Sequence, residues 1–177
     1  IELFLLIKIK KMKKVIFLSF FIISLVTSAQ TTITKNLRDF SVLKVYNGIE
    51  IELIKSTEQK LEITGDKADK VKVKNRGKKL KISLRFPETL AKDKVKIILY
   101  YSKEIKVIDA NEGATITGKG FDQKQIKVKV QEGAFMNLVI NTKHLEVKAS
   151  SGGIIKLSGK TKNQRVKVDL GAVYHGY

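Results

Sequence analysis

Hydrophobic and polar residues alternate through most of the chain from residue 43 onward. This period of two, carried by many β-branched residues, is typical of strands that bury one face. It is clearest at residues 43–45, 49–53 and 60–63. Turn-forming pairs such as Asn47-Gly48 separate these runs. Since almost no segment after residue 30 has helical period, the chain is predicted to be all-β.

Residues 71–84 carry the pattern of a β-hairpin. They read V-K-V-K, then a turn at 75–77, then K-L-K-I-S-L. The short stretch 68–71 fits a helical turn, and residues 90–94 fit a loop or a single turn. Pro87 is the sole proline of the chain, and no low-complexity linker interrupts it, so one domain is expected.

Four segments in the second half share one frame, in which an apolar residue lies five positions before a glycine. The segments are Ile108–Gly113, Val128–Gly133, Val147–Gly152 and Val166–Gly171. The first residues of the four segments are nearly equally spaced along the chain. A period of about 20 residues in short β-like segments is typical of coils that stack on one another.

Aligning the repeats on their glycines gives columns of similar residues. The positions five and three before the glycine are apolar, and the charged position between them faces outward. A small residue follows each glycine, as a tight corner requires: Ala114, Ala134, Gly153 and Ala172. Stacked parallel strands would place equivalent positions in contact, so we predict a right-handed parallel β-helix. An antiparallel β-sandwich also fits regularly spaced turns, but it leaves the aligned corners unexplained.

The segment that precedes the predicted domain has the features of a secretory signal. Lys13 and Lys14 precede an apolar run at 15–26, and Thr27-Ser28-Ala29 forms a small-residue cleavage site. We therefore predict upstream residues outside any domain at 1–11, a signal peptide with a short helix at 12–29, and one domain at 30–177. The chain has no Cys, which excludes a lipoprotein anchor at Gln30. The expected location is the periplasm, the outer-membrane surface or the cell exterior.

The chain is strongly basic, with a formal net charge of +18 at pH 7. Such a surface attracts polyanions, but its lysines alternate with apolar residues, and this pattern favours a solvated strand face over a dedicated polyanion groove. Nucleic acid is not among the expected partners, because the protein is predicted to be exported and its basic positions are not interleaved with aromatic residues. The expected partners are acidic glycans or other cell-surface components, with membrane contact only through the signal segment.

Candidate chemistry in the sequence is sparse, and each candidate has a simple structural explanation. His144 and His175 are expected to be solvated. Asp109 and Asp169 belong to different columns of non-adjacent coils, whereas the adjacent Glu112 and Glu132 form a pair that fits either a cation or solvent. Four tyrosines could stack on sugars but more often belong to a core or cap: Tyr100, Tyr101, Tyr174 and Tyr177. We therefore predict no catalytic residue, no metal ligand and no cofactor, and the sequence singles out no binding residue.

The first half of the domain contains motifs of a known family. The segments N-L-R-D-F-S-V-L-K-V-Y-N-G-I-E-I-E-L at 36–53, L-E-I-T-G at 61–65 and V-K-V-K-N-R-G-K-K-L-K-I-S-L at 71–84 resemble the putative auto-transporter adhesin, head GIN domain family. The glycine-framed repeats extend the resemblance to residue 177. It implies a right-handed β-helix related to pectin-lyase-like folds, no recognised catalytic residues and a role in cell adhesion.

The sequence departs from the family at its corners and at its end. Glu112, Glu132 and Leu170 precede the corner glycines where the family typically has serine. The chain also stops shortly after the fourth corner, which predicts a C-terminally incomplete domain.

These observations predict a non-catalytic exported protein of the cell envelope or surface, which acts in adhesion or binds glycan or envelope components. Two alternatives stay open at this stage. One is a polysaccharide-active enzyme of pectin-lyase-like fold, and the other is a purely structural envelope protein.

Overall fold

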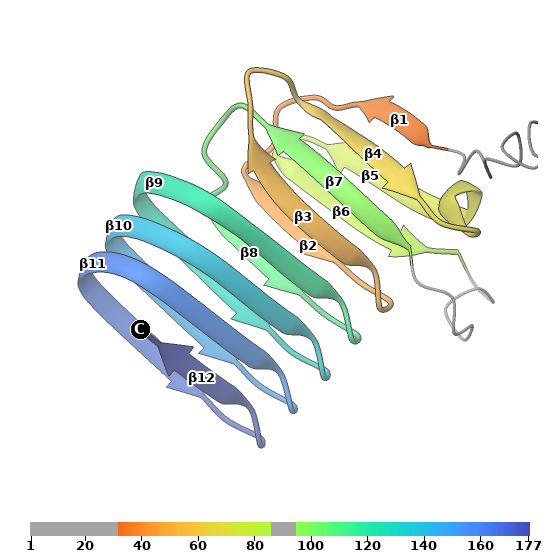
Figure 1. Ribbon diagram of the computed structural model, residues 1–177. Coiled ribbons are helices and arrows are strands. Elements are labelled where there is room, and N and C mark those ends of the chain that lie inside the picture. The colour runs from red at the N-terminus through yellow and green to blue at the C-terminus, as the bar shows by residue number, and fades with distance from the viewer. Residues whose placement is uncertain (1–31, 86–94) are drawn as a thin grey trace, which may run out of the picture. The chain divides into compact units, whose positions relative to one another are not determined.

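The computed structural model describes residues 32–85 and 95–177, and these form a mixed β-sheet (Figure 1). Its strands are β1 (Ile33–Asn36), β2 (Val42–Val45), β3 (Glu50–Lys55), β4 (Lys60–Thr64), β5 (Val71–Arg76), β6 (Lys79–Leu84), β7 (Lys96–Tyr101), β8 (Val107–Ala110), β9 (Thr115–Val130), β10 (Phe135–Ala149), β11 (Ile154–Val168) and β12 (Val173–Gly176). A short 3-10 helix, η1 (Ala68–Lys70), lies between β4 and β5. The predicted upstream residues, signal peptide and signal helix lie outside the described residues, as does the turn at 90–94.

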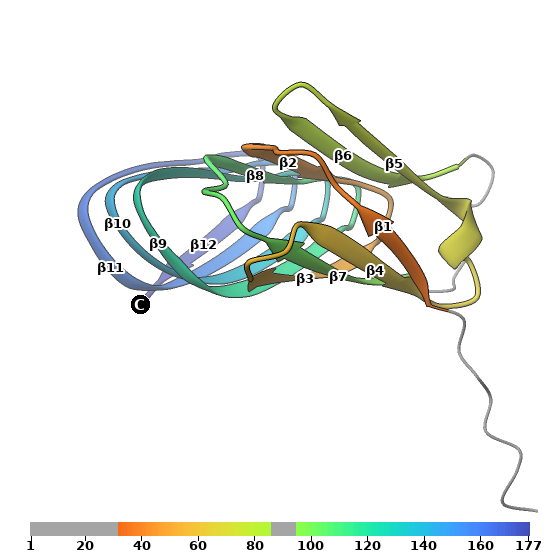
Figure 2. The same ribbon diagram turned by 90° about the horizontal axis from the view of Figure 1, so that it is seen from above.

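The sheet curls because its long strands bend. Residues 115–118 of β9 pair with β3, whereas residues 127–130 of the same strand pair with β8. The described strands therefore follow the order β1-β4-β7-β3-β9-β8-β2-β6-β5, with β10, β11 and β12 continuing from β9. Figure 2 shows β3 and β7 on one side of the curl and β2 and β8 on the other.

The predicted right-handed parallel β-helix is wrong. Strand pairs β1–β4, β4–β7 and β5–β6 run antiparallel, and they join the parallel strands in one open, curled sheet. The prediction extended the period of residues 108–171 to a first half that has no such repeat. There the short link at Gly77-Lys78 can join only antiparallel neighbours, because a parallel connection needs a much longer crossover. The hairpin predicted at 71–84 is confirmed as β5 and β6.

The glycine-framed repeats pair in parallel with one another. Val128 lies opposite Ile108 on one side and Val147 on the other, and Val147 in turn lies opposite Val166. Equivalent positions of neighbouring repeats therefore meet, at the strand spacing of about 4.8 Å. Every outward-facing position of one repeat is consequently beside the same position of the next.

The corners between strands stack through backbone hydrogen bonds. At each corner a residue with positive φ precedes a glycine with positive φ, as at Glu132 (φ 57°) and Gly133 (φ 68°). The Gly133 N–H donates to the Ser151 carbonyl at 3.1 Å, and the same bond recurs from Gly113 to Glu132 at 3.0 Å. The corner of Asn47-Gly48 joins this stack by a 2.8 Å bond to the Glu112 carbonyl. The corner geometry thus fixes the register of the coils.

The hydrophobic core lies between the two halves of the curled sheet. Inward positions such as Leu43, Val128 and Val147 are fully buried. The last members of the inward columns differ, because Val166 is 40% exposed and Val168 is 42% exposed. Within residues 32–85 and 95–177, no helix has the length and apolarity that crossing a membrane would require.

Replacing Tyr101 by Phe is expected to leave stability unchanged or raise it by about 1 kcal/mol, because a buried hydroxyl without a partner costs free energy. The Tyr101 ring is 2% exposed and stacks on Phe121 at 5.5 Å. Its hydroxyl has no hydrogen-bond partner among the described residues. Urea unfolding checks this, with Tyr100→Phe as control, since the Tyr100 hydroxyl donates to Glu62 at 3.4 Å. A clear loss of stability in Tyr101→Phe would show that the hydroxyl is satisfied.

The same variant has an expected pH signature. Burial raises the pKa of Tyr101 to about 12, from an ordinary value of 10.0. Tyrosine in the unfolded chain therefore ionises first, and the wild-type protein should lose stability relative to Tyr101→Phe as the pH rises from 10 to 12.

Candidate functional site: a basic face with a groove across the strands

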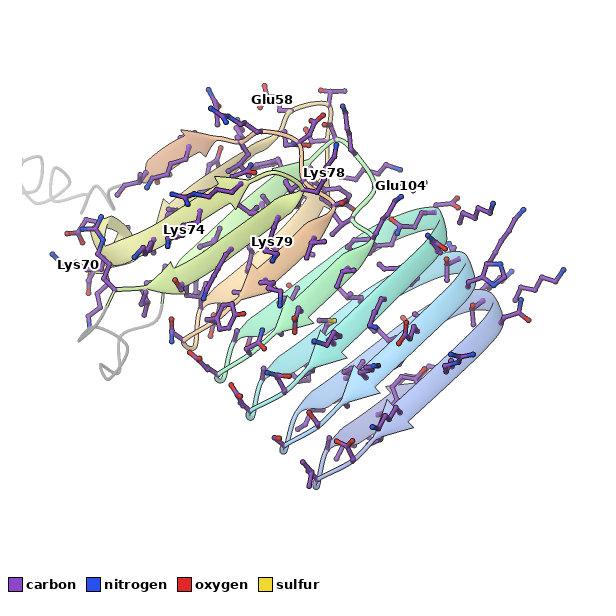
Figure 3. The ribbon with its side chains drawn as sticks, turned by 180° about the vertical axis from the view of Figure 1, so that it is seen from behind. Glu58, Lys70, Lys74, Lys78, Lys79 and Glu104 are labelled. Atoms are coloured by element: carbon purple, nitrogen blue, oxygen red, sulfur yellow. The ribbon has the colours of Figure 1, made fainter. Side chains whose placement is uncertain are left out.

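One outer face of the sheet carries a column of lysines that runs across the strands. We call it the lysine ladder. In spatial order it consists of Lys74, Lys81, Lys44, Asp109, Lys129, Lys148 and Lys167, from strands β5, β6, β2, β8, β9, β10 and β11. Each member lies directly opposite the next, and Asp109 is the sole acidic member. Figure 3 looks onto the face that β5, β6 and β2 share with β8 and β9, with Lys74 labelled on it.

Like charges placed directly opposite one another destabilise a sheet. Most ladder strands are also interior strands, so their lysines do not serve to protect a sheet edge from aggregation. The other half of the sheet does not share this pattern, since Glu50 lies opposite Lys96 there. A local arrangement that costs stability is typical of a functional surface.

Asp109 joins the two halves of the ladder. Its carboxylate contacts the Lys44 ammonium at 3.0 Å and the Lys129 ammonium at 3.3 Å, and it accepts a 3.3 Å hydrogen bond from Asn111. Asp109 itself is only 1% exposed. The hydrogen bond to Asp109 raises the pKa of Lys44 above its ordinary value. The two contacted lysines are therefore held against the sheet, while Lys148 and Lys167 extend further into solvent.

A groove of about 490 Å³ lies beside the ladder on the second halves of β9, β10 and β11. It begins at Lys106 and Val107 of the first coil. Its remaining lining comes from the same three positions of each later coil: residues 125–127, 144–146 and 163–165. The groove therefore crosses the strands rather than following one of them.

The groove presents polar side chains in two columns. Gln125, His144 and Asn163 form one column, and Nδ1 of His144 lies 3.4 Å from Nδ2 of Asn163. The other consists of Lys127, Glu146 and Arg165. Lys127 contacts Glu146 at 2.9 Å, and this hydrogen bond lowers the pKa of Glu146 below its ordinary value. The charge of Glu146 is thus compensated within the site, and the groove is basic on balance.

A second lysine column borders the groove where the strands bend. Residues 122–125, 141–144 and 160–163 read D-Q-K-Q, N-T-K-H and K-T-K-N. The second residue of each segment bonds the carbonyl two positions later: Gln123 to Gln125 at 2.7 Å, Thr142 to His144 at 3.4 Å, and Thr161 to Asn163 at 3.0 Å. This leaves exposed lysines at Lys124, Lys143 and Lys162, which we call the bend column.

Sequence reasoning missed the bend column, although a signal was present. The three segments recur with the same period as the glycine-framed repeats, and each has lysine at its third position. The shared glycine identifies only one corner of each coil in the sequence. The opposite bend is made without a glycine in common, because a polar side chain caps the backbone there instead.

The histidines and carboxylates considered from the sequence are not brought together in one site. Only His144 lies in the groove, whereas His175 stacks on Tyr177 at 6.2 Å. Asp109 lies on β8, whereas Asp169 directly follows the end of β11 and belongs to a different column. Glu112 and Glu132 lie in adjacent corners, where the Glu112 carboxylate accepts a hydrogen bond from Asn47. Across residues 32–85 and 95–177, no three His, Cys, Asp or Glu side chains form a cluster that could hold a metal ion.

The four tyrosines likewise fail to form a sugar-stacking platform. Tyr101 is buried in the core, and Tyr100 lies on β7 in the other half of the sheet. The Tyr174 hydroxyl accepts a 3.0 Å hydrogen bond from Gln164, and Tyr177 is 77% exposed. The arrangement on the basic face is thus suited to binding anions through ammonium, guanidinium and amide groups.

Several solved structures are similar to this chain at low sequence identity. They include a putative adhesin from Parabacteroides merdae ATCC 43184, with 15% identity over 85% of this chain and 97% of that one and a TM-score of 0.44. A putative lipid binding protein from Parabacteroides distasonis ATCC 8503 has 11% identity over 85% and 98%, with a TM-score of 0.49. A putative cell adhesion protein from Clostridium sporogenes ATCC 15579 has 11% identity over 83% and 99%, with a TM-score of 0.46.

No curated protein matches the chain. The family model described as "Putative auto-transporter adhesin, head GIN domain" matches residues 39–177, which is most of the chain and contains the whole lysine ladder, the groove and the bend column. The protein therefore belongs to the putative auto-transporter adhesin, head GIN domain family.

Proposed function

We propose that the protein is a non-catalytic adhesin, exported to the cell envelope or surface, which binds acidic glycans through its basic face. The adhesin description of its family supports the general role and an exported location. The observation that carries the ligand class is the lysine ladder, in which six of the seven strands carry an ammonium group at the same register position.

The strength of such binding would come from many weak contacts. An exposed ion pair contributes about 0.2–1 kcal/mol, so one lysine on the ladder binds little by itself. A polymer that contacts several lysines of the ladder at once gains the sum of their ion-pair free energies. It loses its translational and rotational freedom only once. A rigid sheet that holds the lysines in register suits this form of recognition.

The test is binding to matched charged and neutral glycans. Immobilised polygalacturonate and dextran sulfate should bind the protein at low salt, while methyl-esterified polygalacturonate and dextran should not. Because exposed charges are screened within about 8 Å at 0.15 M ionic strength, binding should weaken steeply between 0.05 and about 0.5 M NaCl. Absence of salt-sensitive binding would contradict the proposal and favour a purely structural role.

A charge-matched pair of variants locates the site. The triple variant Lys129→Gln, Lys148→Gln, Lys167→Gln should weaken binding about tenfold, since three ion pairs of about 0.5 kcal/mol each are lost. The control variant replaces Lys35, Lys55 and Lys96 by Gln. These three lysines are exposed on β1, β3 and β7. It removes the same charge and should weaken binding about twofold at most.

Release of shortened sugars from these polymers would instead support the enzyme alternative.

A further inference from the structure

We propose that the groove takes a linear polymer of uronic acid, with one carboxylate on each sugar, and that this chain lies across the strands. The inference rests on the proposed function and specifies the ligand and its direction at the same site. It is carried by the repetition of the groove from coil to coil.

Three successive coils carry one lysine before the groove and one after it along the strand. Taking the middle coil as the example, Lys143 stands at the bend, His144 lines the groove and Lys148 belongs to the ladder. The coils before and after have Lys124 and Lys162 at the bend, and Lys129 and Lys167 on the ladder. Successive coils thus repeat the same pair of flanking charges, which suits a ligand whose own charges repeat.

The repeat distance identifies the spacing of charge in the ligand. Neighbouring coils are about 4.8 Å apart, which is comparable to the length of one sugar residue in an extended polysaccharide. A uronic acid homopolymer would therefore bring about one carboxylate to each coil. A chain that ran along β10 would meet Lys143 and then Lys148, five positions or about 16 Å away, with Glu146 between them. The across-strand direction offers many more charge pairs.

The groove also has partners for sugar hydroxyls. Gln125, His144 and Asn163 present amide and imidazole groups that both donate and accept hydrogen bonds. All three are exposed at the surface of the groove. Lysines alone would bind any polyanion, so this column is the feature that favours a carbohydrate over other acidic chains.

The first experiment measures affinity against ligand length, using a size series of oligogalacturonates and the intact protein. The groove runs from β8 to β11, three strand spacings or about 14 Å. Affinity should therefore rise steeply up to about four sugars and then level off once the groove is filled. A rise that continues in proportion to length, with no change of slope, would overturn the defined site while leaving general glycan binding intact.

The second experiment separates sugar recognition from charge attraction. The triple variant Gln125→Ala, His144→Ala, Asn163→Ala should bind oligogalacturonates of four or more sugars about tenfold more weakly, because hydroxyl contacts are lost. Its binding to poly-glutamate, a carboxylate polymer without sugar hydroxyls, should change less than about twofold. Equal losses for the two polymers, or no loss for either, would overturn the proposal.

Two controls make these outcomes specific. Urea unfolding midpoints of the variant and the wild-type protein should agree, since the three replaced side chains are exposed. A single-stranded DNA oligomer of matched charge serves as the competing polyanion, and equal or tighter binding of this oligomer would overturn the assignment to uronic acid polymers. If no acidic glycan binds at all, the proposed function fails together with this inference.

Discussion

Replacing Gly159 by Ala is expected to lower the free energy of unfolding by about 3 kcal/mol, from backbone strain plus a steric clash. Gly159 lies in β11 with φ at 121°, a conformation that side chains disfavour. A Cβ added there would lie 2.2 Å from the carbonyl oxygen of Ile140 and 2.9 Å from its carbon. Both atoms belong to the backbone of β10, which is paired with β11 at this point. Relief of the clash would therefore require the two strands to separate locally.

Gly152→Ala provides the matched control. Gly152 has φ at 72°, yet a Cβ at this corner would meet no atom within 4 Å. Only backbone strain of about 1–2 kcal/mol is expected there. Urea unfolding of the two variants at 25 °C separates the cost of backbone strain from the cost of the clash. Hydrogen exchange should show faster opening of the backbone hydrogen bonds between β10 and β11 in Gly159→Ala alone. Equal destabilisation of the two variants would show that the strands accommodate the methyl group.

The sequence predicted the repeated part of the sheet well because its signals are local. Val128 and Val147 are opposite one another as their shared frame requires, and the small corner residues Ala114 and Ala134 are fully buried. The period fixes which residues meet, since a slip of one position would turn every apolar side chain to solvent. This part of the prediction needed no knowledge of the rest of the chain.

The path of the first half could not be predicted in the same way. The alternation in β3 and β4 identifies each strand and its buried face, but not its neighbour. In the structure β7 lies between them, parallel to β3 and antiparallel to β4. These pairings join segments that are far apart in the sequence, since β5 and β6 both lie between β4 and β7. No sequence repeat specifies which of these strands pair. The error in fold class came from this half.

The basic face was likewise predicted only in part. Alternation correctly placed Lys129, Lys148 and Lys167 on an outward face. The sequence does not show that Lys44 and Lys81 extend the same column. This extension arises because β2 pairs with β8 and β6 pairs with β2. The sequence treated these lysines as separate solvated positions, whereas their register makes them one continuous surface.

Asp109 shows most clearly what packing adds to the pattern. By position it is an outward-facing residue, and the sequence considered it as an isolated carboxylate. In the structure the neighbouring lysines cover it, with their side chains about 30% exposed. A carboxylate between two ammonium groups offsets the repulsion that an unbroken lysine column would suffer. Asp109 is therefore an electrostatic link within the fold.

Replacing Asp109 by Asn is expected to lower the free energy of unfolding by about 2 kcal/mol, because the lysines lose a buried acceptor of negative charge. Loss of a fully buried ion pair costs more, but Lys44 and Lys129 retain enough exposure to turn toward water. The loss should shrink as NaCl rises to about 1 M, where salt screens the remaining repulsion between lysines. Urea unfolding at low and high salt measures both effects.

Asp169→Asn is the control for this prediction. Asp169 lies on the same face and contacts Lys167 at 3.6 Å, but its side chain is 40% exposed. Its replacement should change stability by about 0.5 kcal/mol at most, with little dependence on salt. If Asp109→Asn behaved like Asp169→Asn, the ladder would not need a central carboxylate. The lysines would then be independent surface charges, and their register would have no energetic consequence for the fold.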